Sequence, residues 1–313
     1  MIAFIVRRLA AGVALVFVIT TVAYTLLYSS SGDVARKLLG ENATDEQVAA
    51  KTAELGLDRP LVNQYGDWLT DALGGDFGTS YVTGRSVATT VADRLPVTLS
   101  MVLVAIAVTA LISIALGMTA AIRGGWTDRV LQVVSLIGFS LPNFWIALVL
   151  ILTFAVNRSW FPATGYVPLR DDPVDWARSL VLPVTALAVS ATASASQQIR
   201  GAVRDVLELD FVRTLESRGL DRRSILFRHV LRNAAPPALT VLSLQFIALL
   251  GGAVVIEQVF GLRGLGTLTV QSALDTDIPQ LMAIVVVLVI LVVIVNLVID
   301  IVNGWLNPRA RLQ

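Results

Sequence analysis

Six long stretches without a charged side chain constrain the fold of this chain more than any other feature. They cover residues 9–32, 95–122, 130–157, 179–199, 233–256 and 278–299. A helix needs about 20 apolar residues to cross the hydrocarbon core of a bilayer, whereas a strand of a membrane barrel needs about 10. Only helices and closed barrels satisfy their backbone hydrogen bonds in lipid. The sequence therefore predicts an all-α polytopic membrane protein with six transmembrane helices.

The composition agrees with this class and excludes several kinds of chemistry. Hydrophobic residues make up 55% of the 313 residues and charged residues 15%, against about a quarter charged in soluble domains. The chain has no cysteine, which excludes disulfides, thiolate catalysis and cysteine metal sites. His229 is the single histidine, so we expect no metal site.

The charges between the stretches predict the orientation. With Arg7 and Arg8 on the inner side, the inner segments hold 14 basic and 7 acidic residues, and the outer segments hold 10 basic and 16 acidic residues. Cytoplasmic loops carry the excess of Lys and Arg, so we expect both termini in the cytoplasm. The first stretch is too long for the core of a signal peptide, and no A-x-A site follows it. It is predicted to be an uncleaved helix rather than a twin-arginine export signal.

The one sizeable outer segment, 31–94, is predicted to be helical. Thr44 and Gln47 form a capping box that opens a helix, which Gly56 ends. Pro60 suits the first position of a second helix, and Gly74 with Gly75 ends it. About 60 residues without a disulfide are marginal as a free domain. We expect this segment to pack on the membrane part or on a partner.

Polar side chains at membrane depth are costly unless they face protein or water. We expect eight of them to face inward, either along a pathway or at a helix interface: Ser140, Asn143, Gln197, Gln198, Gln245, Glu257, Asn296 and Asp300. Hydrogen bonding between helices is a more frequent reason for such positions than contact with a substrate. The fourth stretch consists almost entirely of Ala, Ser and Thr, and small residues allow helices to approach closely. That helix is predicted to lie centrally.

Catalytic motifs are absent from the sequence. No G-x-x-x-x-G-K-[ST] motif is present, so the chain does not hydrolyse ATP by that route. Residues 261–266 are glycine-rich but follow a transmembrane stretch, and we interpret them as an outer turn. No two carboxylates lie at membrane depth as an acid and base pair. We predict no catalytic residue, which leaves transport or signalling.

The segment 210–232 is the most distinctive part of the inner side. It carries six arginines yet keeps an apolar stripe, which consists of Phe211, Val212, Leu215, Leu220, Ile225, Leu226, Val230 and Leu231. Helical spacing runs from residue 203 through Leu215, Gly219 is suited to end that helix, and Asp221 can cap a second one. Two interpretations remain open from periodicity alone. The pair of helices lies on anionic lipid, or it inserts as a lever into a cytoplasmic partner.

The motifs of this segment resemble the coupling loop of binding-protein-dependent ABC importer permeases. The matching residues are Phe211-Val-Arg-Thr-Leu-Glu-Ser-Arg-Gly-Leu and Arg228-His-Val-Leu-Arg-Asn. Arg213-Thr214-Leu215 depart from the E-A-A triplet of the wider family. The chain also resembles the peptide/nickel branch, subunit-B type, in five other segments: Gly56-Leu-Asp-Arg-Pro60, Gly75-Asp-Phe-Gly-Thr-Ser-Tyr81, Ser140-Leu-Pro-Asn-Phe-Trp145, Glu257-Gln-Val-Phe260 and Asp277-Ile-Pro279. Asn307 stands where that branch has an acidic residue before Pro-Arg.

The resemblance implies a type I ABC importer permease fold in a bacterial plasma (inner) membrane. It divides the chain into residues 1–93 (first helix and outer cap), a permease domain 94–303 with its coupling loop 200–232, and a cytoplasmic tail 304–313. It also implies four kinds of partner: a second permease subunit, one or two cytoplasmic ATPase subunits that bind ATP and Mg, an outer substrate-binding protein and membrane lipid. Nucleic acid is not among them, and this chain itself needs no cofactor.

The same resemblance assigns contact with the ATPase to nine residues: Thr214, Leu215, Glu216, Gly219, Leu220, Ile225, Leu226, Arg228 and His229. The implied function is uptake of di- and oligopeptides. Nickel, glutathione or another small solute is the alternative within the class. A membrane scaffold or sensor that recruits a partner without transport is the alternative from another class.

Overall fold

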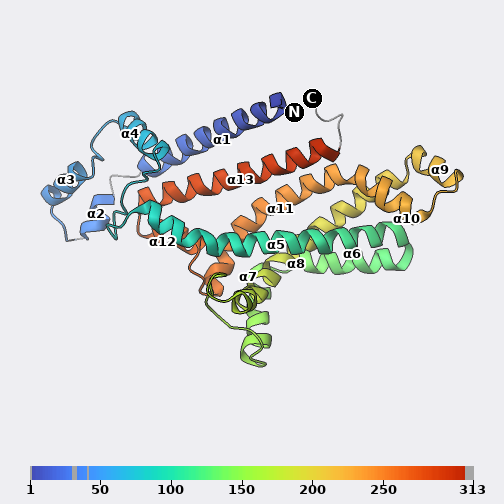
Figure 1. The fold of residues 1–313 in the computed structure, drawn as a ribbon. Helices are drawn as coiled ribbons and strands as arrows, with labels where there is room; N and C mark the ends of the chain where they lie inside the picture. The colour runs from blue at the N-terminus through green and yellow to red at the C-terminus, as the bar shows by residue number, and fades with distance from the viewer. Residues whose placement is uncertain (1, 30–33, 41, 307–313) are drawn as a thin grey trace. The chain divides into compact units, whose positions relative to one another are not determined.

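The computed structural model describes residues 2–29, 34–40 and 42–306, and within these ranges the chain is helical and holds no β-strand (Figure 1). A single isolated β-bridge joins Thr79 and Ser86. The helices are α1 Ile2–Ser29, α2 Val34–Leu39, α3 Asp45–Glu54, α4 Leu61–Leu73, α5 Val87–Arg123, α6 Gly125–Ser140, α7 Asn143–Leu150, η2 Ile151–Val156, α8 Pro173–Leu207, α9 Asp210–Ser217, α10 Arg222–Ser224, η3 Ile225–Val230, α11 Leu231–Val259, α12 Leu265–Leu274 and α13 Ile278–Leu306.

Five helical segments in the described ranges are long and apolar enough to cross a membrane, and a sixth arises if one bent pair counts as a single span. The bent pair joins α6 to α7 and η2 at an angle of 93°. Residues 130–157 were predicted as one of six transmembrane helices, and this stretch forms the bent pair. Pro142 has no N–H to donate and forces the preceding Leu141 into an extended conformation, with ψ 127°, so the helix ends there.

Within the described part of the chain, residues 2–5, 97–262 and 294–306 form one compact unit, organised around α8. Its long run of small residues is buried, which confirms the predicted central position of this helix. Gly117 of α5 shows how closely the neighbours approach, because a Cβ there would lie 2.9 Å from the carbonyl oxygen of Ser196. A Cβ on Gly138 of α6 would lie 3.3 Å from the Cβ of Ala193. The small side chains of α8 therefore determine which helices pack against it.

Residues 6–29, 34–40, 42–96 and 263–293 form the second unit, which contains α2, α3, α4 and α12. Thr44 and Gln47 form the predicted capping box at the start of α3, and Gly56 follows its end with φ +66°. Pro60 precedes α4 as its N-cap, one residue before the predicted position. An aromatic cluster of Tyr24, Tyr28, Tyr65 and Trp68 packs α4 against α1.

A buried hydrogen bond fixes the loop before α5 within this second unit. The Ser80 hydroxyl donates to Asp277 Oδ2 over 2.5 Å, and the backbone N–H of Tyr81 donates to Asp277 Oδ1 over 3.1 Å. Both Ser80 and Asp277 are buried. The carboxylate accepts several hydrogen bonds, as a buried charged group requires. Of the tail predicted for 304–313, residues 307–313 lie outside the described part of the chain.

Candidate functional site

The helix that leads into segment 210–232 ends earlier than its hydrophobic periodicity predicted. α8 ends at Leu207, Leu209 is extended with ψ 143°, and α9 starts at Asp210. Continuous helix from residue 203 through Leu215 was therefore a wrong expectation. The change of direction at Leu209 lets both Val206 and Val212 lie in the same buried cluster. The apolar repeat by itself would fit one continuous helix. Tertiary packing instead breaks the helix at Leu209.

The turn between the two short helices agrees with the prediction. Gly219 has φ +76°, and its N–H donates to the carbonyl of Glu216 over 2.9 Å. The N–H of Leu220 reaches back to the carbonyl of Leu215 over 3.3 Å, which completes a glycine C-terminal cap. Asp221 then caps the next helix by accepting the N–H of Arg223 over 3.1 Å. The sequence signals for the end of one helix and the start of the next are both confirmed.

Most of the apolar stripe in 210–232 packs against other side chains of this chain. Val212, Ile225 and Val230 are at most 3% exposed, in a cluster with side chains of α5, α8 and α11. Leu215 and Leu226 are partly buried against the same cluster. Ile225, which the resemblance assigns to contact with the ATPase, packs in the core of this chain. The stripe holds the two short helices to the ends of the long ones.

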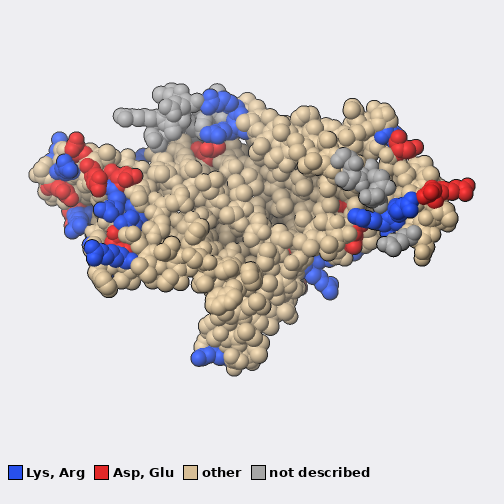
Figure 2. Space-filling view, turned by 180° about the vertical axis from the view of Figure 1, so that it is seen from behind, with Lys and Arg blue, Asp and Glu red and all other residues tan. Residues whose placement is uncertain are grey.

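The exposed face of this segment is polar, with a few apolar side chains. Thr214, Glu216, Gly219 and Arg228 are exposed, Leu220 is 37% exposed, and His229 is half-buried. Figure 2 shows Lys, Arg, Asp and Glu gathered over α9 and α10, whereas the surface over the long helices is nearly free of charge. Phe227 is 64% exposed, although the sequence analysis did not single it out. The sequence signal for this exposed side chain was a large apolar residue two positions after Ile225.

An ion pair that the sequence analysis missed joins α6 to α8. Arg200 donates to both carboxylate oxygens of Asp128, with Nη2 2.5 Å from Oδ2. The two side chains are only 17% and 11% exposed, and Nη1 of Arg204 lies 3.9 Å from the same carboxylate. From the sequence, these residues were counted only among the charges that predict the membrane orientation. Their pairing depends on the packing of α6 on α8, because the two residues are 72 positions apart in sequence.

Four of the eight polar positions in the spans lie at helix interfaces. Glu257 is fully buried and accepts the Thr98 hydroxyl over 2.5 Å. The side chain of Asn143 accepts the Ser190 hydroxyl over 2.6 Å, and the Asn296 side chain accepts the hydroxyl of Ser243. Gln245 donates to the Ser194 hydroxyl over 3.1 Å. Each of these groups has its polar partner within the same compact unit.

The other four differ in exposure. Gln197 is half-buried, with its amide nitrogen 3.4 Å from the carbonyl of Gln132, and Asp300 is half-buried too. Ser140 and Gln198 are exposed, and the Ser140 hydroxyl donates to its own helix. A cavity of about 560 Å³ lies between α6 and α8, lined by Gln132, Val133, Ser135, Leu136, Phe139, Ala193, Ser194, Gln197 and Gln198. Its lining is uncharged and includes three amide side chains.

Comparison with known families accounts for this arrangement of helices. Residues 113–312 match the family described as "Binding-protein-dependent transport system inner membrane component", and residues 1–102 match its N-terminal family. The chain belongs to this family of inner membrane components. It is thus the transmembrane permease component of an ABC importer and a multi-pass protein of the inner membrane. ATP hydrolysis in such systems is carried out by separate subunits.

Individual relatives cover 99% of the chain. A putative peptide transport system permease protein of Brucella abortus is 38% identical over 312 residues, 99% of each chain. The oligopeptide transport system permease protein AppB of Bacillus subtilis is 35% identical, and the glutathione transport system permease protein GsiC of Escherichia coli is 31% identical, each over 99% of both chains. The inward-facing MetNI methionine ABC transporter shares the fold, with TM-score 0.54 and 17% identity over 69% of this chain and 96% of that chain.

Proposed function

We propose that this chain is one of two different permease subunits that together form the pathway for di- and oligopeptides. The observation that carries the proposal is the similarity to two proteins named as peptide and oligopeptide permeases, which extends over 99% of each chain. A substrate-binding protein delivers the peptide from outside, and ATPase subunits that bind ATP and Mg act from the cytoplasm. Both termini lie in the cytoplasm, as the distribution of arginines favours.

Segment 210–232 transmits the movement of the ATPase in this proposal. The exposed residues Thr214, Glu216, Gly219 and Leu220 contact the ATPase, and the exposed Arg228 and the half-buried His229 follow them in the same segment. The buried residues Ile225, Leu215 and Leu226 act indirectly, because they fasten the exposed face to α8 and α11. A helix pair anchored in a packed core moves as a unit with the spans, since packed cores are not continuously deformable.

In the proposal, the cavity between α6 and α8 forms this chain's part of the peptide pathway. Its lining has no charged side chain, while Gln132, Gln197, Gln198 and Ser194 offer both donors and acceptors. Such groups hydrogen-bond to any peptide backbone without selecting its side chains. This chemistry suits a pathway whose selectivity lies in a separate binding protein.

The proposed division of the chain places the first helix and outer cap in residues 1–93, the permease domain in 94–303 and the tail in 304–313. Its support is that the N-terminal family match ends at residue 102 and the permease match begins at residue 113.

Uptake into proteoliposomes tests the proposed function. The chain is purified with co-expressed subunits, reconstituted, and supplied with ATP, binding protein and a labelled di- or pentapeptide. We expect ATP-dependent accumulation that requires this chain. Glutathione is the second candidate substrate, because a relative at 31% identity is named as a glutathione permease. Uptake of glutathione but of no peptide would overturn the peptide assignment and favour the second candidate.

A further inference from the structure

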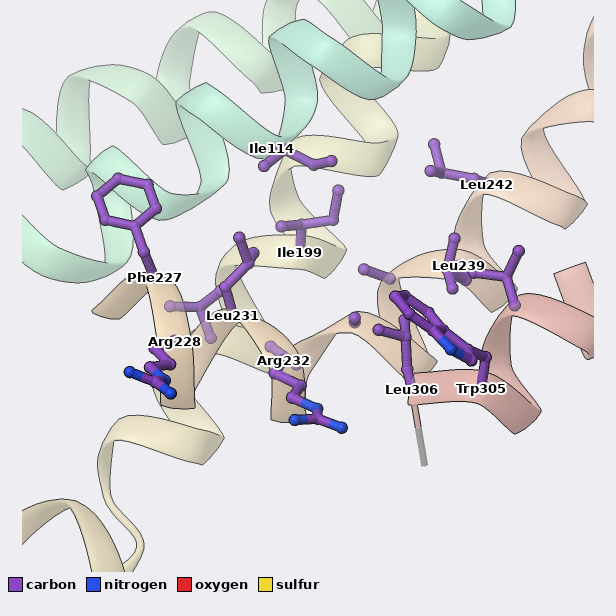
Figure 3. Close-up of a pocket in the computed structure, with 15 residues that line it drawn as sticks. Ile114, Ile199, Phe227, Arg228, Leu231, Arg232, Leu239, Leu242, Trp305 and Leu306 are labelled. Atoms are coloured by element: carbon purple, nitrogen blue, oxygen red, sulfur yellow. The ribbon is translucent and has the colours of Figure 1, made fainter. Parts of the chain in front are cut away.

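An apolar cavity of about 660 Å³ opens where α5, α8, η3, α11 and α13 meet, within one compact unit (Figure 3). Its wall is mostly apolar and includes Ile114, Ile199, Leu239 and Leu242. The volume lies within the range of sites that hold a whole small ligand, about 300–1,000 Å³. The cavity thus has room for a long apolar group.

The mouth of this cavity is strongly basic. Figure 3 shows the guanidinium groups of Arg228 and Arg232 on the same side of the cavity, opposite Ile114 and Leu242. The lining contains no Asp or Glu. Neither arginine lies within 4.0 Å of a carboxylate in the part of the chain that the structure describes. Two positive charges beside an apolar cavity whose described lining holds no acidic side chain favour a ligand with an anionic head and an apolar tail.

The position of the mouth along the spans also favours this kind of ligand. Arg232 directly precedes the charge-free stretch 233–256, and Trp305 is the next to last described residue of α13. Trp305 is 70% exposed and lines the same cavity. Arginine and tryptophan at the end of a span mark the level of the lipid headgroups. The cavity therefore begins at the headgroup level and continues toward the hydrocarbon core.

We propose that this cavity binds an anionic phospholipid, with the phosphate at Arg228 and Arg232 and an acyl chain in the apolar cavity. Basic pockets between transmembrane helices are suited to anionic headgroups. The chain's own C-terminal tail is a poor occupant, because Arg309 and Arg311 would add positive charge beside the two arginines. Since η3 and α11 contribute both the cavity and the end of segment 210–232, a bound lipid would stabilise the base of that segment.

Quenching of Trp305 by brominated lipid tests the proposal. The full chain with its co-purified subunits is placed in nanodiscs that contain brominated phosphatidylglycerol or, at equal fraction, brominated phosphatidylcholine. The signal is the quenching of the wild type minus the quenching of Trp305→Phe. This difference removes the contribution of the other five tryptophans. We expect phosphatidylglycerol to quench Trp305 at a roughly five-fold lower fraction for each arginine that contacts it.

Two charge variants distinguish a site from general attraction. Arg228→Gln with Arg232→Gln is expected to abolish the preference for phosphatidylglycerol. Arg222→Gln with Arg223→Gln removes equal charge from exposed positions outside the cavity and is expected to keep it. If Trp305→Phe fails to fold, native mass spectrometry of lipids retained by the wild type and the charge variants replaces the quenching.

Three results would overturn the proposal. Equal quenching by both lipids would mean ordinary contact with the bilayer. Quenching by the isolated chain that is lost in the complex would mean that another subunit fills the cavity. Equal loss in both double variants would mean a general charge effect. Each readout measures binding rather than uptake, so failure of the peptide assignment would leave the result unaffected.

Discussion

Removal of Asp128 is expected to destabilise the packing of α6 on α8 by about 3 kcal/mol. Breaking a buried ion pair costs about 3–5 kcal/mol, because it leaves the other charge without a partner. The lower end applies here, since the side chains of Asp128 and Arg200 keep 11% and 17% exposure. In Asp128→Asn the shape is kept, but Arg200 loses its counter-charge and Arg204 remains nearby. The effect is therefore electrostatic rather than steric.

The measurement is the apparent Tm of the purified complex, taken as the temperature that halves the monodisperse peak. On the scale of about 2–4 °C per kcal/mol for domains of 150–250 residues, Asp128→Asn should lower Tm by about 6–12 °C. Arg204→Gln is the matched control, because this side chain is 51% exposed and its pair with Asp128 is worth at most about 1 kcal/mol. The double variant Asp128→Leu with Arg200→Met should recover most of the loss, since an apolar pair replaces the buried charges.

Two outcomes would refute the reasoning. If Asp128→Asn lowers Tm no more than Arg204→Gln does, the pair is solvated and contributes little. If the apolar double variant is as unstable as the sum of its two single variants, the residues do not interact as the geometry implies.

The other predictions concern segment 210–232 and the contact of α5 with α8. Gly219→Ala should destabilise the turn by about 1–2 kcal/mol because of its positive φ and should reduce uptake, whereas Gly219→Asn should be milder; equal uptake by both would contradict this. Leu220→Glu should release the ATPase in a pull-down while the chain stays folded. Ile225→Glu should instead abolish folded expression, and normal expression of it would show that the side chain is not buried. Gly117→Leu should lower Tm by several degrees, with an unchanged Tm arguing against close helix contact.

Local signals in the sequence predicted the ends of helices well. The capping box at Thr44, the glycine after α9 and the Asp221 cap depend on residues within six positions of one another, so no distant packing is needed to form them. The break at Pro142 is equally local, because a proline lacks the backbone N–H and restricts the residue before it. A proline between the two apolar halves of a span is the sequence signal for such a bend.

The candidate site was only partly predictable. Segment 210–232 was recognised from its charges, its glycine and its family-like motifs, which lie together in sequence. The burial of Ile225 within the chain was not predictable, because an amphipathic pattern shows that a face is buried and does not show which surface buries it. Arg232 and Trp305 could not be linked from sequence, since they lie 73 positions apart and meet only at the end of packed helices.

The sequence by itself determined that the chain is a helical membrane protein without its own ATPase motif, because span length, charge and motif composition are properties of short stretches. Only the tertiary structure decided that the stripe of segment 210–232 faces inward, that Asp128 pairs with Arg200 and that two arginines share the mouth of an apolar cavity. These features require side chains from separate helices to meet. Such meetings depend on helix packing, as in the close approach of Gly117 of α5 and Gly138 of α6 to α8.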